Sequence, residues 1–234
     1  MLHPETVEAE TLALIKRLSS DPVLKEFVLV GGTALSLQLG YRKSIDIDLF
    51  SAKPFDAKAM REYLKEHYQG VDMGVLGNAV FSRIQGVKVD MIAHQYPWVD
   101  PVKEMEGIRM ASTLEIGAMK MNAISNSGER LKDFIDMHFL LENHSLEQFT
   151  NAYAAKYKDA NPNIAKNALL YHDQIDFAGD IHLLNRKFNW PDIAKRLRMA
   201  VANPKKVFPT IKSDSRLERN QRLEGPKQKK GRRR

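Results

Sequence analysis

The 234-residue chain contains no cysteine, which excludes a disulfide scaffold, a thiolate nucleophile and any cysteine-ligated zinc or iron–sulfur site. It also lacks an apolar run near the roughly 18 residues that a membrane-spanning helix needs. The first ten residues, MLHPETVEAE, are acidic and polar, unlike a secretory signal. The sequence therefore predicts a cytoplasmic protein with no membrane partner, and it gives no signal for an oligomeric state.

Positive charge is concentrated at the C-terminus. Residues 205–234 carry 12 Lys and Arg against 3 Asp and Glu, so their net charge is +9, whereas residues 1–204 carry about −2. Such a segment could bind RNA phosphates by releasing counterions, or it could be a solubilising end without a ligand. The composition is 43% hydrophobic, enough for one large domain or for a domain with an appendage.

Hydrophobic periodicity predicts an α/β first half and a helical second half. Helices are expected at 5–19, 56–68, 112–124, 129–142 and in further segments to about 201, and strands at 27–30, 45–50, 79–85 and 87–93. We therefore expect an α/β domain at 1–110, a helical domain at 111–204, and a basic, flexible tail at 205–234.

The predicted strand at 27–30 ends at Gly31-Gly32. A glycine turn that leads into a helix offers free backbone N–H groups, which suit a phosphate. Thr33 is predicted to cap this helix through its side chain, and Gly40 is predicted to end it. Taken alone, a Gly-Gly pair is more often only a turn.

Acidic and apolar residues alternate in the segment IDIDLF (45–50). This period predicts a strand with Ile45, Ile47 and Leu49 on one face and Asp46 and Asp48 on the other. The two carboxylates would lie roughly 6–7 Å apart, and a divalent cation such as Mg²⁺ would relieve their repulsion. Asp90, in the predicted strand 87–93, could complete the ligand set. An Asp-x-Asp pair is more often a solvated face, but the joint pattern favours metal-dependent phosphate chemistry.

Two stretches resemble a known family. GGTAL (31–35) followed by RKSIDIDLF (42–50) resembles the polymerase-β-like nucleotidyltransferase superfamily, and more narrowly its AbiEii/AbiGii-type toxin branch. MKMNAI (119–124) and KDFID (132–136) resemble that branch's Lys-x-x-Ala and Lys/Arg-Asp-x-x-Asp helices. The resemblance covers about residues 25–142. It implies a nucleotidyltransferase-fold mixed sheet with flanking helices, followed by a mostly helical C-terminal half.

The resemblance also implies an activity and a site. The activity would be Mg²⁺- or Mn²⁺-dependent transfer of an NMP from an NTP to an acceptor, with RNA such as tRNA as the acceptor and a cognate antitoxin as a partner. The metal ligands would be Asp46, Asp48 and Asp90. The catalytic set would comprise these three with Lys120 and Asp136. The nucleotide-binding set would comprise Gly31, Gly32, Thr33, Arg42, Ser44, Lys120 and Asp133.

One position departs from the branch, which commonly has an Arg just before a Gly after the Lys-x-x-Ala helix. Here Ser127-Gly128 stands in that place, and Arg130 could replace the lost contact. Lys120 is expected to be an exposed lysine that reaches the triphosphate, with a solvated helix lysine as the alternative.

Two rival functions stay open. The acceptor could be a small molecule, as in antibiotic-modifying nucleotidyltransferases, or the chain could be an inactive nucleotide- or RNA-binding module. His94 is expected past the end of its strand and away from substrate. Tyr96, Pro97 and Trp98 are expected to pack the strand–helix connection, with a wall of a base pocket as the alternative.

Overall fold

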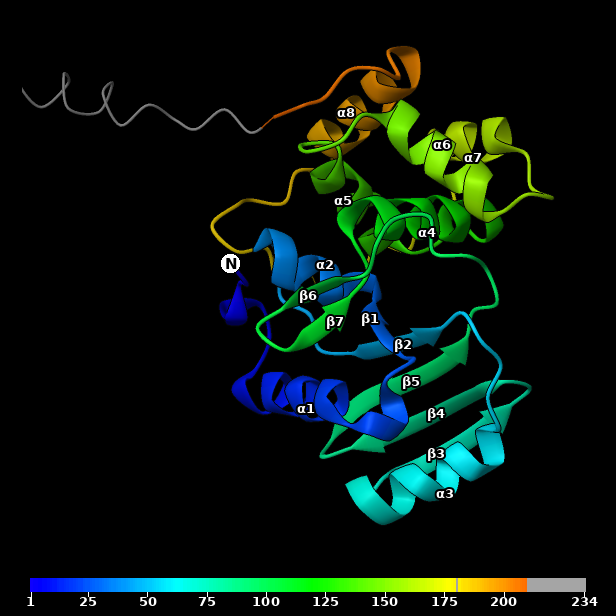
Figure 1. Cartoon of the computed structure of the whole chain (residues 1–234). Coiled ribbons are helices and arrows are strands. Elements are labelled where there is room, and N and C mark those ends of the chain that lie inside the picture. Colours follow the sequence, from blue (N-terminus) through cyan, green and yellow to red (C-terminus); the bar gives the residue numbers. More distant parts are fainter. Residues whose placement is uncertain (180, 210–234) are drawn as a thin grey trace, which may run out of the picture.

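A seven-stranded mixed sheet forms the centre of the computed structural model, which describes residues 1–179 and 181–209 (Figure 1). The strand order is β3-β4-β5-β2-β1-β7-β6. The strands are β1 (Val28–Val30), β2 (Ile47–Ser51), β3 (Val71–Leu76), β4 (Ala79–Ile84), β5 (Val87–Ala93), β6 (Lys103–Met105) and β7 (Ile108–Met110). β2 runs parallel to β5 and antiparallel to β1, and β7 runs parallel to β1.

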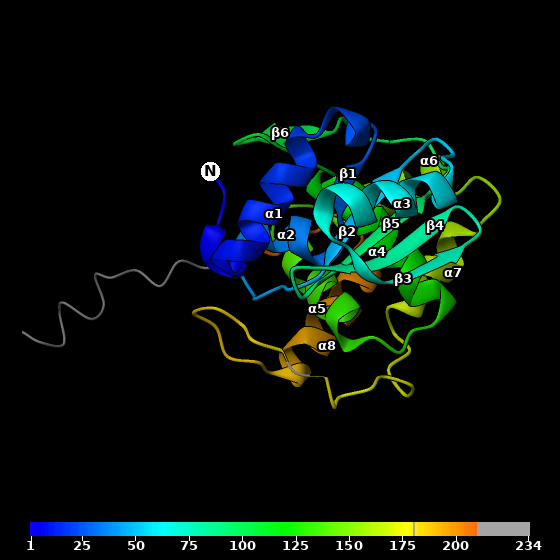
Figure 2. The same ribbon diagram turned by 90° about the horizontal axis from the view of Figure 1, so that it is seen from below.

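Helices cover both faces of this sheet (Figures 1 and 2). Those of the first half are α1 (Ala9–Ser20), α2 (Gly31–Leu39) and α3 (Ala57–Tyr68), with short 3-10 turns at Pro4–Thr6 and Pro22–Leu24. Those of the second half are α4 (Thr113–Asn126), α5 (Leu131–Leu140), α6 (Leu146–Lys156), α7 (Pro162–Ala168) and α8 (Trp190–Ala202). The predicted α/β fold class with a helical C-terminal region is confirmed.

The two faces of β2 have opposite character, as its alternating sequence predicts. Ile47 and Leu49 are buried in the hydrophobic core, and the core of buried apolar side chains continues from the sheet into α4 to α8. The prediction for Ile45 is wrong: it precedes the strand and is 65% exposed. Alternation alone does not tell where strand pairing begins, and β2 first pairs with β5 at Ile47.

Three strands were not predicted: β3, β6 and β7. β3 is an edge strand with an irregular register between Val71 and Gly74, and most of its residues are exposed. β6 and β7 are only three residues long. Short or half-paired strands carry too few alternations for a periodic signal, because their pairing depends on tertiary contacts.

Two of the predicted helix ends are confirmed, and one predicted helix cap is wrong. Gly40 ends α2 with a positive φ of 69°, and Ser112 caps α4 by accepting a hydrogen bond from the backbone N–H of Glu115. The prediction for Thr33 is wrong, because α2 already begins at Gly31 and Thr33 lies inside it. The Thr33 hydroxyl instead donates to the Oγ of Ser44 at 2.8 Å and to the backbone carbonyl of Asp46.

The first residues of the predicted basic tail lie against the folded body. The backbone N–H of Phe208 donates to the carbonyl of Leu141 at 2.8 Å, and the Phe208 side chain packs against the core. Residues 205–209 therefore contact the folded body, while the predicted tail at 210–234 lies outside the described residues. The boundary between an α/β domain and a helical domain near residue 110 stays a prediction. No helix in the described ranges is long and apolar enough to cross a membrane.

Candidate active site

Asp48 and Asp90 are register partners on the parallel strands β2 and β5. Partners in neighbouring strands point to the same face of the sheet and lie about 4.8 Å apart at the backbone. Asp46, just before β2, and both partners line one cavity of about 450 Å³. The structure therefore brings the three predicted metal ligands to the same side of this cavity, which we call its floor.

The floor of this cavity changes character along the two strands. Asp48 and Asp90 are followed two residues later by Phe50 and Ile92, and His94 continues the row beyond β5. Residues two apart on a strand share a face, so the floor is acidic where the strands begin and apolar where they end. A ligand with a charged end and a ring-shaped apolar end matches this gradient.

Helix α4 forms the opposite wall. Ile116, Met119, Lys120 and Asn122 line the cavity from this helix, and Tyr157 lines it from the end of α6. Arg130, between α4 and α5, lines the same cavity and a neighbouring one of about 290 Å³. The acidic floor therefore faces cationic side chains from the helical half of the chain.

Close approaches explain the two glycines at the start of α2. Gly31 has a positive φ of 68°, and a Cβ there would lie 2.6 Å from Oδ2 of Asp48. A Cβ on Gly32 would lie 2.2 Å from Nη2 of Arg42. Both glycines also line the cavity, so the start of α2 presents backbone N–H groups beside the carboxylates.

Arg42 and Asp136 are buried together away from the cavity floor. Nε of Arg42 donates to Oδ1 of Asp136 at 2.8 Å, and Nη2 donates to Oδ2 at 3.1 Å. The Tyr41 hydroxyl also donates to Oδ1. Asp136, which the resemblance places in the catalytic set, is 0% exposed. We assign it a positioning role towards the cations around it.

The expectation that Lys120 is exposed is wrong, because its exposed fraction is 7%. Its Nζ lies 2.5 Å from Oδ1 of Asp133 and 2.7 Å from Oδ2 of Asp136. Burial lowers the pKa of Lys120, but Asp136 and Asp133 outweigh that effect and hold the pKa above its ordinary value. Lys120 is thus a fixed, permanently charged ammonium at the cavity wall.

Asp136 has the opposite shift. Burial by itself would raise the pKa of this carboxyl, but the charges of Arg42 and Lys120 and their hydrogen bonds hold it well below its usual range. Asp133 is also buried, with the exposed Arg130 3.9 Å away on its other oxygen. The predicted nucleotide-binding residues Arg42 and Asp133 therefore act in this ion-pair network, and only their outer surfaces border the cavities.

The carboxylates of the floor fit a divalent cation by their chemistry. Burial and the neighbouring Asp90 raise the pKa of Asp48, and Oδ1 of Asp90 is buried without a hydrogen-bond partner. Hard carboxylate oxygens under mutual repulsion are ligands that Mg²⁺ prefers. Among the described residues, no three acidic or histidine side chains are grouped closely enough to form a metal site as they stand.

The sequence did not single out Lys88, although its signal was there. It lies two residues before Asp90 and therefore on the same strand face. Its Nζ donates to Oδ2 of Asp90 at 2.7 Å. This hydrogen bond, together with the charges of Asp90, Asp46 and Asp48, raises the pKa of Lys88.

His94 lies just past the end of β5, as expected, and its ring lines the cavity. Nε2 of His94 lies 3.2 Å from the Tyr157 hydroxyl, and its ring centroid is 5.1 Å from Phe50 and 4.8 Å from Tyr96. Burial and the charge of Lys156 lower the pKa of His94 to about 4, so the ring is neutral at pH 7. No motif in the sequence pointed to Tyr157.

A buried ion pair fixes the connection that follows β5. Nζ of Lys156 lies 2.6 Å from Oε1 of Glu115 and donates to the carbonyl of Pro97 at 2.9 Å. Oε2 of Glu115 accepts a hydrogen bond from the N–H of Val99, and the Lys156 ammonium lies 5.1 Å from the Trp98 ring. This connection is packed as expected, and it holds the aromatic end of the cavity in place.

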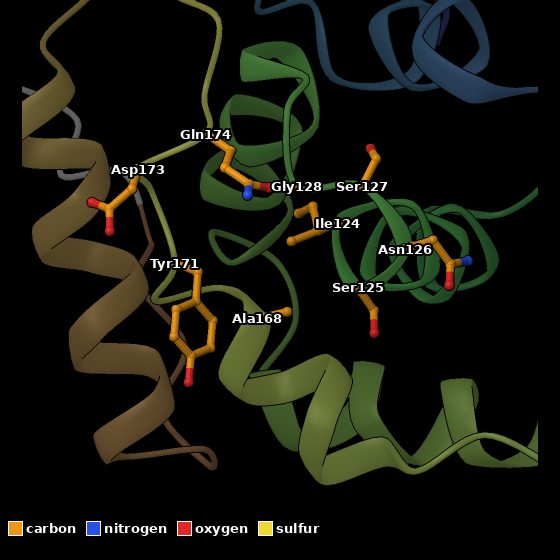
Figure 3. A pocket seen from close by; sticks show the side chains of 9 residues that line it. All are labelled: Ile124, Ser125, Asn126, Ser127, Gly128, Ala168, Tyr171, Asp173 and Gln174. Carbon is orange, nitrogen blue, oxygen red and sulfur yellow. The ribbon is translucent and has the colours of Figure 1, made fainter.

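Ser127, which replaces the Arg of the family pattern, lies at a different cavity of about 360 Å³ beyond the end of α4 (Figure 3). The cavity is lined by Ile124, Ser125, Asn126, Ser127, Gly128, Ala168, Tyr171, Asp173 and Gln174. Asp173 is the one charged side chain among these described lining residues. Arg130 instead lies at the Asp48 cavity, where it is close to Lys120.

Comparisons with solved structures define the fold. A candidate nucleotidyltransferase from H. pylori is similar over 83% of this chain and 94% of its own, with 20% identity and a TM-score of 0.50. JHP933 from Helicobacter pylori is 18% identical over 92% of this chain and 97% of its own, with a TM-score of 0.48. The first of these two similarities shows that the chain has the nucleotidyltransferase fold.

The sequence comparisons show a family similarity over part of the chain. Residues 13–98 match the family model described as "Nucleotidyl transferase AbiEii toxin, Type IV TA system". The resemblance seen in the sequence is therefore confirmed, because residues 13–98 are similar to this nucleotidyltransferase toxin family. The uncharacterized protein aq_aa25 of Aquifex aeolicus (strain VF5) is 27% identical over 173 residues, or 71% of this chain and 84% of its own.

Proposed function

We propose that this protein is a metal-dependent nucleotidyltransferase that transfers an NMP from an NTP to an acceptor. The observation that carries the proposal is the pairing of Asp48 with Asp90 on a cavity floor beside the Gly31-Gly32 helix start. Carboxylates that bind a metal, backbone donors for phosphate and facing cations are the parts that phosphoryl transfer needs.

Asp46, Asp48 and Asp90 are the proposed ligands of one or two divalent cations. Mg²⁺ or Mn²⁺ bound there would stabilise the charge on the attacking and leaving oxygens of an in-line displacement. Asp90 is also placed to accept the proton of an attacking hydroxyl, because its buried Oδ1 has no hydrogen-bond partner. The acceptor would then approach over β5.

The triphosphate is proposed to lie between the start of α2 and the cations of the helical half. Gly31, Gly32 and Thr33 would offer backbone N–H groups. Lys120 and Arg130 border the same cavity and would neutralise charge as it moves onto the leaving pyrophosphate. Asp133 and Asp136 would keep the Lys120 ammonium charged and directed, while Arg42 supports Asp136 from behind.

The nucleoside is proposed to occupy the apolar end of the cavity. Phe50, Ile92, His94 and Tyr157 gather there, and the neutral His94 ring with the Tyr157 hydroxyl can donate and accept hydrogen bonds. A base stacked on aromatic side chains gains roughly 1–3 kcal/mol. The wall of a base pocket that the sequence left as an alternative is therefore assigned mainly to His94 and Tyr157.

The acceptor and the biological role follow from the family. We propose an RNA such as tRNA as the acceptor, a toxin role within a toxin–antitoxin pair, and a cognate antitoxin as the partner, since the matched family is described as a toxin of such a system. A small-molecule acceptor and an inactive binding module of the same fold are the competing outcomes of the test.

The test is incubation of the protein with each radiolabelled NTP, Mg²⁺ and total bacterial RNA, followed by gel separation. Labelled RNA of tRNA size that depends on Mg²⁺ supports the proposal. Asp48→Asn is the control and should give no label. Label on small molecules alone would support the small-molecule enzyme, and tight NTP binding without label on any acceptor would support the binding module.

A further inference from the structure

The ammonium of Lys88 contacts Asp90, which is one of the proposed metal ligands. Its Nζ is 2.7 Å from Oδ2 of Asp90, and its side chain is 51% exposed, whereas that of Asp90 is 9% exposed. The other oxygen of Asp90, Oδ1, is buried with no partner. One oxygen of the Asp90 carboxylate is thus paired with a half-exposed ammonium, and the other oxygen has no partner.

We propose that Lys88 is a built-in counter-ion that holds Asp90 in the metal-free protein and competes with the divalent cation for it. This inference rests on the metal site of the proposed function and adds a positioning residue to it. Asp48 and Asp90 sit side by side in register, so their like charges destabilise the metal-free sheet unless a cation lies nearby. Lys88 provides that cation.

The exposure of Lys88 allows a divalent cation to displace its ammonium from Asp90. A half-exposed ammonium on a four-carbon stem loses little when it moves into water, because exposed ion pairs contribute at most about 1 kcal/mol. A divalent cation at Asp90 would repel the ammonium and release it. The absence of a ready-made three-ligand cluster among the described residues agrees with a site that assembles only when Lys88 leaves.

Arg83 offers a matched control. It is the register partner of Lys88 on the neighbouring strand β4, and removal of its charge changes the net charge by the same amount. Its side chain lies 3.6 Å from Asp72 and donates to the carbonyl of Gly86 instead of contacting Asp90. Arg83→Met therefore tests bulk charge, and Lys88→Met tests the ion pair.

The experiment measures Mn²⁺ binding to the full chain by calorimetry, without nucleotide. Lys88→Met should bind Mn²⁺ about three- to fivefold more tightly than the wild type, and Arg83→Met should bind like the wild type. In thermal melts, Lys88→Met should be less stable than the wild type without metal and should gain more stability when Mn²⁺ is added.

Three results would overturn the role of Lys88: unchanged Mn²⁺ affinity in Lys88→Met, weaker affinity, or an equal gain in Arg83→Met. Failure of the proposed transferase function can be distinguished from failure of the counter-ion role. If Lys88→Met binds Mn²⁺ more tightly but no NTP is transferred, the counter-ion role stands and the transferase function falls. Absence of Mn²⁺ binding in every variant would remove the metal site and the counter-ion role together.

Discussion

The ammonium of Lys120 lies 2.7 Å from the carboxylate of Asp136, and both side chains are buried. This contact joins α4 to α5, and through Arg42 it extends to the segment between α2 and β2. The charge that faces the acidic cavity floor is therefore held by the same network that ties the helical half to the sheet. Stability and function are coupled at Lys120.

Lys120→Ala should destabilise the protein by about 3 kcal/mol, because it leaves a buried carboxylate without its partner. The sequence alone suggested an unchanged melt, as for a surface lysine. Urea unfolding checks the value, with Lys195→Ala on the exposed face of α8 as the control; it should stay within about 0.5 kcal/mol of the wild type. A Lys120→Ala protein as stable as Lys195→Ala would contradict the buried network.

Asp48→Asn should behave in the opposite way. Burial and Asp90 raise the pKa of Asp48, so the charged form is disfavoured in the folded state, and a neutral amide should stabilise the metal-free protein by about 1 kcal/mol at pH 8. The same change should abolish Mn²⁺ binding. Thermal melts with and without Mn²⁺ check both effects, and a less stable variant that still binds Mn²⁺ would exclude the assigned role.

The decrease in the free energy of unfolding at acidic pH should depend on the protonation of His94. Its folded pKa of about 4 lies below its ordinary value, so the unfolded chain binds more protons between about pH 6.5 and 4, and stability must fall as the pH falls through this window. His138, with a pKa lowered to about 4 by burial, adds to the same slope.

His94→Gln should flatten that slope by up to about one proton, since the group that titrates is gone. Urea unfolding at half-unit steps from pH 4.5 to 7 gives the slope. His67→Gln, at an exposed position on α3, is the matched histidine-to-glutamine control. An equal slope in wild type and His94→Gln would show that His94 is not buried in its neutral form.

Tyr157→Phe should separate nucleoside binding from phosphate binding. Loss of the hydroxyl removes the partner of His94 and should weaken NTP binding about fivefold, with no change for inorganic tripolyphosphate. Calorimetry with both ligands checks the difference. Tyr171→Phe, at the separate cavity of Figure 3, should alter neither affinity, and an equal loss for both ligands in Tyr157→Phe would contradict a nucleoside end.

Deletion of residues 210–234 tests the sequence prediction that the basic segment binds RNA. Because Phe208 packs on the core, a deletion from 210 spares the contacts of residues 205–209. RNA affinity should then depend less steeply on salt, since fewer counterions are released, while NTP binding stays the same. An unchanged slope of log K against log salt concentration would show that the segment does not contribute.

Much of the site could be predicted because its signals are local. A strand places residues two apart on one face, so the alternating segment predicted that Asp46 and Asp48 lie near each other, and both line the cavity although Asp46 precedes β2. The glycine pair marks a backbone that approaches other groups closely, and the structure shows Asp48 and Arg42 at those two positions. The same period placed Lys88 beside Asp90, although that signal was not used.

The sequence by itself thus determined the acidic strand face, the glycine pair at the start of α2 and the change from mixed strands and helices to helices alone. Only the tertiary structure decided which charges meet. Lys120 and Asp136 lie on different helices, and the Tyr157 hydroxyl reaches His94 across 63 residues. Local periodicity predicts which face of its helix or strand a residue lies on. The burial and the pKa of that residue depend on the side chains of other elements that pack against this face.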